Sequence, residues 1–459
     1  MKHNNRYSKL SAIAAAIFIA GAAGNVYAQG AKRLSLDEAI QLSLQSSGKI
    51  RIANAKVDEA SANLHEARDN RLPDVKASGT YMRLNNPDVN LKVKLGSSSG
   101  TGTGTGTGTE QTQGGAVKVD QAAYALVNAS MPLFSGFRIK YGVESARYLQ
   151  QAAKLDAEKD KDEVVANTID AYSNLYKAKK TVDLVKENLT REQKRVTDFS
   201  NLEQNGLMAR NDLLKVQLQQ SNIELSLLDA ENNYKITSIN MALLLGLPED
   251  TDLIPDSTSL INNTDAGSVI QWEQTALQNR KDKAALIVRK QAADVAIKAA
   301  KGEYFPGLAI TGGYIAADIP NVLTITNALN VGLGLQYNFA TLWKTSAKVD
   351  AARARYHQIE ASEGLISDQI RVELNHAYQN YLLSQKKITV YAKSIEQADE
   401  NYRITKNKYD NSLVTTTDLL DADVAQLQAQ LNYAFSKADA MVAYKKLQQT
   451  AGVLQTSNK

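Results

Sequence analysis

The feature that most constrains the fold is the near absence of helix-breaking residues from two long segments. Residues 138–205 hold no proline and one glycine, Gly142, and residues 344–411 hold no proline and one glycine, Gly364. Apolar or aromatic side chains recur every seven residues in both segments: Leu175, Val182, Leu189 and Val196 in the first; Tyr381, Ile388, Ile395, Tyr402 and Tyr409 in the second. A helix through 68 residues would be about 100 Å long, and a heptad pattern of that length predicts coiled coil.

The two long segments belong to an internal duplication of the chain. The sequence matches itself at an offset of 206 residues between about residues 125 and 246, and at an offset of 233 residues upstream of there. Identical pairs include Tyr172/Tyr378, Asp212/Asp418, Gly246/Gly452, Pro73/Pro306 and Tyr81/Tyr314. Since the offsets differ by 27 residues, the first copy carries an insertion between Tyr81 and Ala125, where the chain reads GTGTGTGTGT at 100–109. Such a tract cannot bury enough surface to offset its ordering entropy, so we expect a flexible loop.

The remaining helical segments are about half as long as the two long ones. Four of them are expected, at 36–71, 212–245, 268–303 and 418–451. Two short helices placed end to end would nearly match one long helix, so each long helix could have a short partner on either side of its midpoint. The tight turns at 205–211 and 411–417 would then close two helical hairpins.

Alternating patterns mark four candidate strands, at 75–84, 125–133, 308–315 and 331–339. In the last of these, Val331, Leu333 and Leu335 alternate with small or polar residues. A strand of about ten residues with one apolar and one polar face is typical of a transmembrane β-barrel, although the edge of a soluble sandwich has the same pattern. Four strands cannot close a barrel, so two or three copies of the chain would have to share one.

The start of the chain is typical of a secretory signal peptide. Lys2, Arg6 and Lys9 precede an apolar run at 10–23, and Val-Tyr-Ala at 26–28 resembles an Ala-x-Ala cleavage site. We therefore predict that residues 1–28 are removed, with a membrane anchor as the alternative if cleavage fails.

The composition argues against several classes of function. Removal of the predicted leader leaves 50 basic against 49 acidic residues, which gives no support for binding of nucleic acid. The chain has no cysteine and four scattered histidines, so it offers no disulfide framework and no thiolate metal site. No catalytic triad, phosphate loop or metal-ligand spacing emerges. We therefore expect no enzyme, no catalytic residues, no bound metal and no cofactor.

Several motifs, taken in order, carry a family resemblance over nearly all of the mature sequence. They read LSLDEAIQLSL at 34–44, LPDVKASGTY at 72–81, MPLFSGF at 131–137, NGLMARNDLL at 205–214 and NSLVTTTDLLDA at 411–422. With the internal duplication, they resemble the TolC-like outer-membrane efflux proteins, also called outer membrane factors. The resemblance implies a mainly α fold with a β-barrel membrane part: a homotrimer whose shared 12-stranded β-barrel is continued by a long α-helical barrel.

The same resemblance implies a location, a function and partners. The protein is expected in the cell outer membrane, in contact with its lipid and extending into the periplasm. It would be the passive exit duct of a tripartite efflux pump or of a type I secretion system, opened at its periplasmic tip by a periplasmic adaptor and an inner-membrane pump. The alternative is a periplasmic coiled-coil adaptor, which also has long helical hairpins; the four strands and the duplication argue against it.

These expectations divide the chain into four parts. The signal peptide, 1–28, is followed by a first structural repeat, 29–245, then an equatorial linker, 246–267, and a second repeat, 268–459. Each repeat would contain a helix, a strand hairpin and a long helical hairpin; the strand hairpins are expected at 74–134 and 307–339. The Gly-Thr loop, 97–113, would join the first two strands on the cell exterior, and its deletion should leave transport intact.

The resemblance also points to a periplasmic gate. In the family the narrowest point is ringed by aspartates, and the matching residues are Asp418 and Asp421, three apart and therefore on one helical face. In a trimer they would form two stacked rings that favour cations. Capping of a helix start is the alternative for Asp418, as it is for its repeat mate Asp212, and a plain surface charge is the alternative for Asp421.

Polar links between neighbouring hairpins lock the closed gate in the family, and the matching positions are Tyr409 and Asp212. Tyr409 continues a heptad row, so ordinary packing is an equal alternative. Where the best-known member has an arginine, this chain has Val414, and Arg210 on the other tip could take over that charge link. Adaptor contacts are expected at the tips, whose small or apolar residues could instead pack between hairpins: Gly206, Leu207, Met208, Leu413 and Val414.

Overall fold

The computed structural model describes residues 32–85, 88–89, 117–256, 267–320 and 323–454. The predicted signal peptide and Gly-Thr loop lie outside these residues, as does part of the expected equatorial linker, 257–266. The chain forms two compact units, each built from both copies of the duplication. The first unit takes its described residues from 1–56, 154–285 and 363–459, and the second takes them from 57–153 and 286–362.

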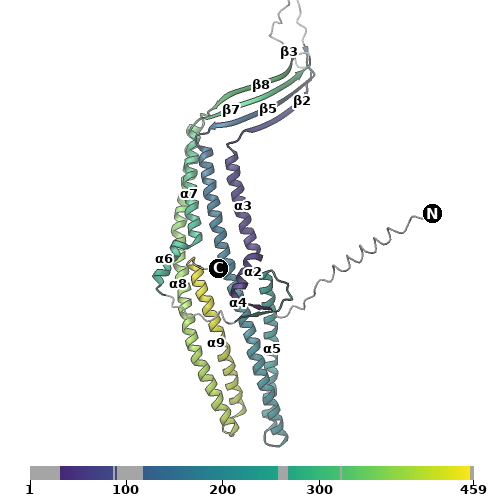
Figure 1. Ribbon diagram of the computed structural model, residues 1–459, viewed down its shortest axis with the longest axis vertical. Helices are drawn as coiled ribbons and strands as arrows, with labels where there is room; N and C mark the ends of the chain where they lie inside the picture. The colour runs from purple at the N-terminus through teal and green to yellow at the C-terminus, as the bar shows by residue number, and fades with distance from the viewer. Residues whose placement is uncertain (1–31, 86–87, 90–116, 257–266, 321–322, 455–459) are drawn as a thin grey trace, which may run out of the picture. The chain divides into compact units, whose positions relative to one another are not determined.

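Long helices dominate the described residues (Figure 1). The helices are α2 (Leu36–Ser46), α3 (Gly48–Asp69), α4 (Arg138–Gln204), α5 (Arg210–Leu245), α6 (Val269–Asn279), α7 (Lys281–Lys301), the short 3-10 helix η2 (Gly302–Tyr304), α8 (Thr341–Asp410) and α9 (Thr416–Thr450). With 67 and 70 residues, α4 and α8 confirm the two long helices predicted from the lack of proline. No described helix contains a stretch long and apolar enough to cross a lipid bilayer.

The two 36-residue segments, each expected to form one helix, are broken. The first is divided at Ser47 and the second at Arg280, where ψ swings to 121° and 120° and the helix restarts one residue later. These two residues are 233 apart and therefore occupy the same place in the two copies. Each break packs against a left-handed glycine that ends a neighbouring helix: Gly246 after α5 and Gly452 after α9, with φ of 69° and 71°.

The strands form three sheets. They are β1 (Lys32–Leu34), β2 (Asp74–Arg83), β3 (Asp88–Val89), β4 (Val117–Lys118), β5 (Gln121–Phe134), β6 (Leu253–Pro255), β7 (Gly307–Ile319) and β8 (Leu323–Gln336). In the second unit, four strands lie side by side in the antiparallel order β2-β5-β7-β8, so β2 and β8 form the edges (Figure 1). The last strand begins earlier than the predicted Val331 and ends before Tyr337, and β7 also continues past the predicted Ile315.

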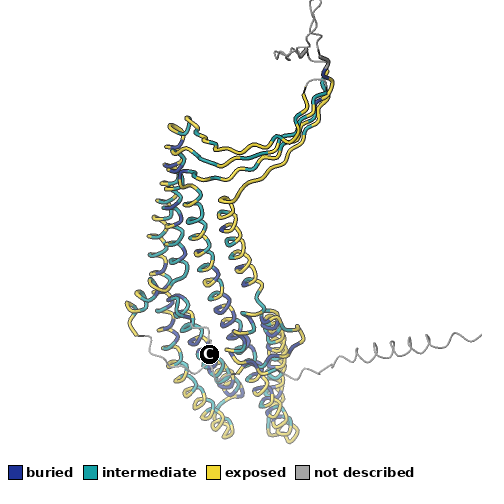
Figure 2. Tube along the Cα trace, turned by 45° about the horizontal axis from the view of Figure 1, so that its top comes forward, coloured by how far each residue is buried: buried dark blue, intermediate teal, exposed yellow. Residues whose placement is uncertain are grey.

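The register of the four-stranded sheet places most of its large apolar side chains on one face. Cross-strand partners point to the same side, and successive residues alternate between sides. Aligned rows on the first side are Val75–Ala129–Gly312–Val331, Ala77–Val127–Tyr314–Leu329, Met131–Ile310–Leu333 and Leu308–Leu335. Aligned rows on the second side are Asp74–Ser130–Thr311–Gly332, Lys76–Asn128–Gly313–Asn330 and Ser78–Leu126–Ile315–Ala328. The apolar face is open: Leu329, Val331, Leu333 and Leu335 are 72–78% exposed, and Figure 2 shows the strands as mostly exposed or intermediate.

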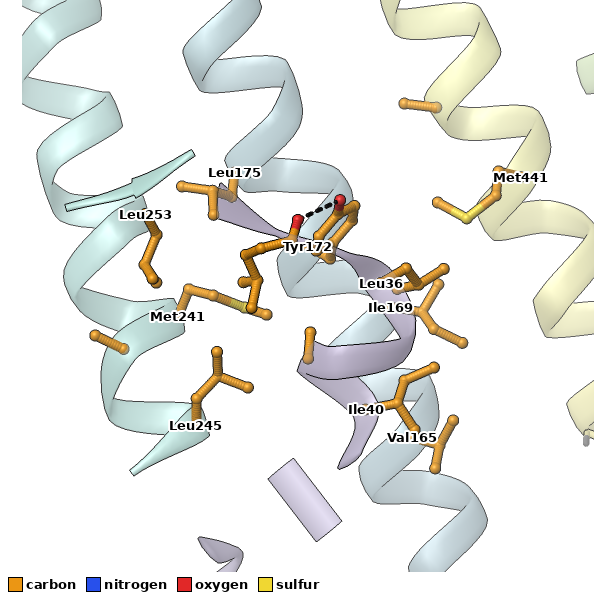
Figure 3. Packing of buried hydrophobic residues seen from close by; sticks show 14 of the residues in the cluster. Leu36, Ile40, Val165, Ile169, Tyr172, Leu175, Met241, Leu245, Leu253 and Met441 are labelled. Carbon is orange, nitrogen blue, oxygen red and sulfur yellow. Dashed lines mark hydrogen bonds between the residues drawn. The ribbon is translucent and has the colours of Figure 1, made fainter. Parts of the chain in front are cut away.

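The main hydrophobic core belongs to the first unit, where α2, α4, α5 and the short parallel pair β1–β6 meet (Figure 3). Its centre is Tyr172 of α4, which is fully buried. The Tyr172 hydroxyl donates to the carbonyl oxygens of Leu34 and Asp256, at 2.9 and 2.8 Å. Its hydrogen bonds therefore tie the long helix to the C-terminal ends of both paired strands, while Leu175, Met241 and Leu253 pack around it.

Candidate functional site: the helical tips

The two helical hairpins end in turns of the same backbone form, 205–209 and 411–415, and both lie in the first unit. Gly206 and Ser412, 206 residues apart, are both left-handed, with φ of 70° and 59°. The Leu207 N–H donates to the Leu202 carbonyl at 2.9 Å, and the Leu413 N–H donates to the Lys408 carbonyl at 2.8 Å. These bonds across the left-handed residue are the usual C-terminal cap of a helix, so each long helix ends in the same way.

The two tips differ in how the next helix begins. Thr415 caps α9: its hydroxyl accepts from the Asp418 N–H at 3.2 Å, and the Asp418 carboxylate accepts from the Thr415 N–H at 2.8 Å. The capping alternative therefore holds for Asp418, whose carboxylate takes part in the capping box, although Asp418 is the third residue of α9 and Thr415 is the N-cap. The corresponding residue of the first tip is Ala209, which has no side-chain bond to offer α5.

Asp212 and Asp418 fall in the first turns of α5 and α9, and Asp421 lies one turn further along α9. Asp418 and Asp421 are exposed on α9, and hydrogen bonds from Thr415 lower the pKa of the Asp418 carboxyl. Its repeat mate Asp212 occupies the same third position of α5 and pairs with Lys215 at 3.3 Å. Asp418 is thus held as a carboxylate on the outside of the first helical turn.

Tyr409 lies between the two tips. It is half-buried, its ring stacks on that of Phe199 with centroids 5.5 Å apart, and it belongs to a cluster with Leu213 and Leu419. Burial raises the pKa of the Tyr409 hydroxyl, a hydrogen bond with Thr416 opposes the rise, and the charge of Asp212 adds to it. The structure therefore brings Tyr409 near Asp212 while also giving it a packing role.

Of the other predicted tip residues, Met208 packs against this cluster, whereas Arg210, Leu207 and Leu413 are exposed. Arg210 is exposed and its guanidinium pairs with Glu203 of α4 at 3.3 Å, within its own hairpin. Leu207 and Leu413 are 75% and 73% exposed, so both tips present an apolar side chain to their surroundings. Met208 and Val414 are half-buried, and Gly206 is exposed.

Sequence reasoning missed a buried polar cluster that joins the two hairpins, consisting of Asn188, Glu192 and Arg195 of α4, Tyr402 of α8 and Asp423 of α9. Asn188, Glu192 and Asp423 are at most 1% exposed, and Arg195 is 9% exposed. The signal was a second heptad row, Val185–Glu192–Phe199, in which the middle residue is charged while its neighbours are core residues.

The guanidinium of Arg195 is the centre of the buried polar cluster. It lies 2.5 Å from Glu192 and 3.5 Å from Asp423, and it donates to the Tyr402 hydroxyl at 3.1 Å. The Asn188 amide donates to the second oxygen of Asp423 at 2.9 Å. Among the described residues, one oxygen of Glu192 and one of Asp423 are buried without a hydrogen-bond partner.

Metal binding finds no support in the described ranges, where no group of three or more His, Cys, Asp or Glu is placed to hold an ion.

Comparison with known proteins identifies the family. The sequence profile of the family described as "Outer membrane efflux protein" matches residues 39–247 and 272–453, which is most of the chain. The chain therefore belongs to the outer membrane efflux protein family, as the sequence motifs predicted. Its members are outer-membrane channels, so the protein is placed in the outer membrane and extends into the periplasm. A comparison with curated protein sequences gives no match.

Solved structures of outer-membrane channels share the fold. OprN is 19% identical, with a TM-score of 0.72 over 91% of this chain and 89% of that one. CmeC of Campylobacter jejuni is 14% identical, with a TM-score of 0.73 over 92% of this chain and 87% of that one. The open state of MtrE from Neisseria gonorrhoeae is 17% identical, with a TM-score of 0.66 over 92% and 90%.

Proposed function

We propose that three copies of the chain form one outer-membrane channel, the exit duct of a tripartite efflux pump or a type I secretion system. The observation that carries the proposal is the four-stranded sheet, which has a continuous apolar face and two edges that no other described strand pairs with. An open sheet edge in lipid leaves backbone N–H and C=O groups without partners. Pairing of β8 of one copy with β2 of the next removes both edges, and three copies give a barrel of twelve strands.

The helices of the first unit support the same assembly. Six apolar side chains on α5 are at least half exposed in the single chain: Leu214, Leu218, Leu225, Leu228, Ile236 and Leu243. The heptad row of α8 is only partly covered as well, since Ile388, Ile395 and Tyr402 are half-buried while Leu175, Val182 and Leu189 of α4 are buried. Neighbouring copies would cover these rows and complete a helical barrel. In this proposal residues 29–245 and 268–459 are two copies of one structural unit, joined by the linker 246–267.

The tips are the gate of the proposed channel. Asp418 and Asp421 form two stacked rings at the narrow end, and Tyr409 and Asp212 hold neighbouring hairpins together. A channel without a nucleotide site takes its energy from partners, so an inner-membrane pump and a periplasmic adaptor open it, with Leu207 and Leu413 as contacts. The open state described for MtrE supports the idea that such tips open in this family.

Assembly and conduction are tested together. The purified protein should have the mass of three chains in detergent by light scattering, and it should conduct ions in planar bilayers. A soluble monomer that passes no current would refute the channel.

The aspartate rings are tested by cation block. Asp418→Ala with Asp421→Ala should abolish block of the channel by divalent or trivalent cations added on the periplasmic side, because the carboxylates that bind them are removed. Asp229→Ala removes an exposed carboxylate far along α5 from the tip and should leave block unchanged. Persistent block in the double variant would refute the assignment.

The proposed lock is tested by conductance. Tyr409→Phe with Asp212→Ala should raise single-channel conductance, because both polar groups between the hairpins are lost. Arg210→Ala serves as the comparison, since Arg210 pairs within its own hairpin. A low, unchanged conductance in the double variant would remove Tyr409 and Asp212 from the lock.

A further inference from the structure

The buried polar cluster carries an imbalance of charge. Two carboxyls, Glu192 and Asp423, share one guanidinium, that of Arg195, in a site almost closed to water. If both carboxyls are ionised, one negative charge is in excess, and burial penalises such a charge heavily. A proton on one carboxyl balances the three groups.

The surroundings identify Glu192 as the proton carrier. Burial raises the pKa of Glu192 to about 7; Arg195 opposes the rise, Asp423 of α9 adds to it, and Arg191 of α4 opposes it. Arg191 is itself paired with Glu187 at 3.0 Å. Tyr402 of α8 also faces the cluster, where its hydroxyl accepts a hydrogen bond from Arg195.

The cluster also holds the two hairpins of one chain together. Asn188, Glu192 and Arg195 come from the first hairpin, and Tyr402 and Asp423 come from the second. Three interactions of the cluster cross between the hairpins: Asn188 with Asp423, Arg195 with Asp423, and Arg195 with Tyr402. Separation of the hairpins would therefore break these bonds and admit water to both carboxyls.

We propose that the buried polar cluster is a proton-binding latch between the two hairpins, which keeps a proton on Glu192 while α4, α8 and α9 are packed together and releases it when they part. The latch is distinct from the lock at Tyr409 and Asp212. Its effect on the gate rests on the proposed function, whereas its effect on hairpin packing does not.

The sign of the pH effect follows from linkage. The ordinary pKa of a glutamate is 4.5, and that of packed Glu192 is about 7, so the packed form binds more protons within this window. Packing is therefore strongest below pH 4.5, weakens as the pH rises towards 7, and is constant above it. Acid closes the latch and alkali loosens it.

Infrared spectroscopy tests the latch without reference to transport. The assembled protein in detergent should show a C=O stretching band of a buried carboxylic acid that disappears with a midpoint near pH 7. Glu192→Gln should remove the band, whereas Glu187→Gln, which changes an exposed carboxylate five residues away on α4, should keep it. A titrating band that survives in Glu192→Gln, or the absence of such a band in the unmodified protein, would overturn the proposal.

A second variant covers the case in which Glu192→Gln does not fold. Asp423→Asn removes the negative neighbour of Glu192 and keeps a similar shape, so the midpoint of the band should move to lower pH. A midpoint that stays in place would show that the charge of Asp423 does not keep the proton on Glu192, and would overturn the latch.

Conduction then connects the latch to the gate. The open probability of the unmodified channel should rise at least tenfold between pH 5 and pH 8, whereas Glu192→Gln should stay low at both pH values and Glu187→Gln should behave as the unmodified protein. A band that titrates in a protein without current would refute the proposed channel and leave the latch intact. Current without the band would refute the latch and leave the channel intact.

Discussion

The chain breaks its shorter helices twice, after α2 and after α6, and the two joints share a backbone form but differ in chemistry. At the first, Gly246 packs against Ser46, whose hydroxyl donates to the Leu244 carbonyl at 3.2 Å. At the second, Gly452 packs against the backbone of Asn279 and Arg280. Here the Arg280 guanidinium, and not a serine hydroxyl, bonds across the joint. That guanidinium pairs with Asp282 at 2.6 Å and Glu373 at 2.8 Å, and it donates to the Thr450 carbonyl at 3.3 Å.

The comparison shows that the glycine is common to both joints, whereas the side chains that bond across them differ. Both copies keep a left-handed glycine, because only a residue without Cβ allows the next helix to approach so closely. The side chains that bond across the joint are free to differ: a small hydroxyl serves in one copy and a charged network in the other. The backbone approach is therefore the shared constraint, and substitutions can separate its contribution from that of the side chains.

The largest expected effect is at the joint glycines. In Gly452→Ala the new Cβ would lie 2.9 Å from backbone atoms of Asn279, and in Gly246→Ala it would lie 2.6 Å from the Ser46 Cβ. Left-handed strain and overpacking together should cost roughly 3 kcal/mol at each site. Gly206→Ala is the matched control, since φ is 70° and its Cβ meets nothing within 4 Å, so it should cost only about 1 kcal/mol.

Thermal unfolding followed by circular dichroism checks this order. Equal midpoints for Gly206→Ala and Gly452→Ala would show that close approach does not determine the joint.

An intermediate effect is expected from the side chains that differ between the joints. Arg280→Ala removes two ion pairs and leaves the half-buried Asp282 without its partner, which should cost about 2 kcal/mol. Ser47→Ala, at the equivalent position of the first copy, should change stability by less than about 0.5 kcal/mol. Hydrogen exchange of α6 and the start of α7 should report the loss as faster local opening. Equal protection in Arg280→Ala and Ser47→Ala would show that the ion pairs of Arg280 do not stabilise the second joint.

The smallest effect is expected at the tips, where the start of α9 has a side-chain cap and the start of α5 has none. Thr415→Ala should cost about 1 kcal/mol of local stability, and Ala209→Thr should add a smaller amount to α5. Hydrogen exchange of the first turns of α5 and α9 measures both changes. If exchange at α9 is unaffected by Thr415→Ala, the capping box makes no net contribution.

The regular parts of the fold were predictable because their signals are local. Absence of proline over 68 residues leaves a long helix as the main option, and α4 and α8 have that form. Alternation placed Leu308, Ile310 and Tyr314 on one face of a strand, and the register confirms this. The added length of β7 and β8 was not predictable, because a bulge near Ile315 and the left-handed Asn327 interrupt their alternation.

The joints were not predictable because they depend on distant partners, and for the buried polar cluster the sequence holds one signal, the charged Glu192 within a core heptad row. Neither Ser47 nor Arg280 is a glycine or proline, although Gly48 follows the first, and each break packs against the end of a helix about 170 to 200 residues away. Glu192 reads as a surface charge until α8 and α9 are placed against α4. The tips could be located from the family resemblance, whereas the partners of Arg210 and Asp418 required coordinates.

The short parallel ladder of Lys32–Leu34 with Leu253–Pro255 has a consequence for biogenesis. A ribosome makes the first of these strands about 220 residues before the second, so the leading edge of the nascent polypeptide has no partner for half of translation. Closing so large a ring is costly in entropy, and helices that form within the intervening segment reduce the length of flexible chain that the ring encloses.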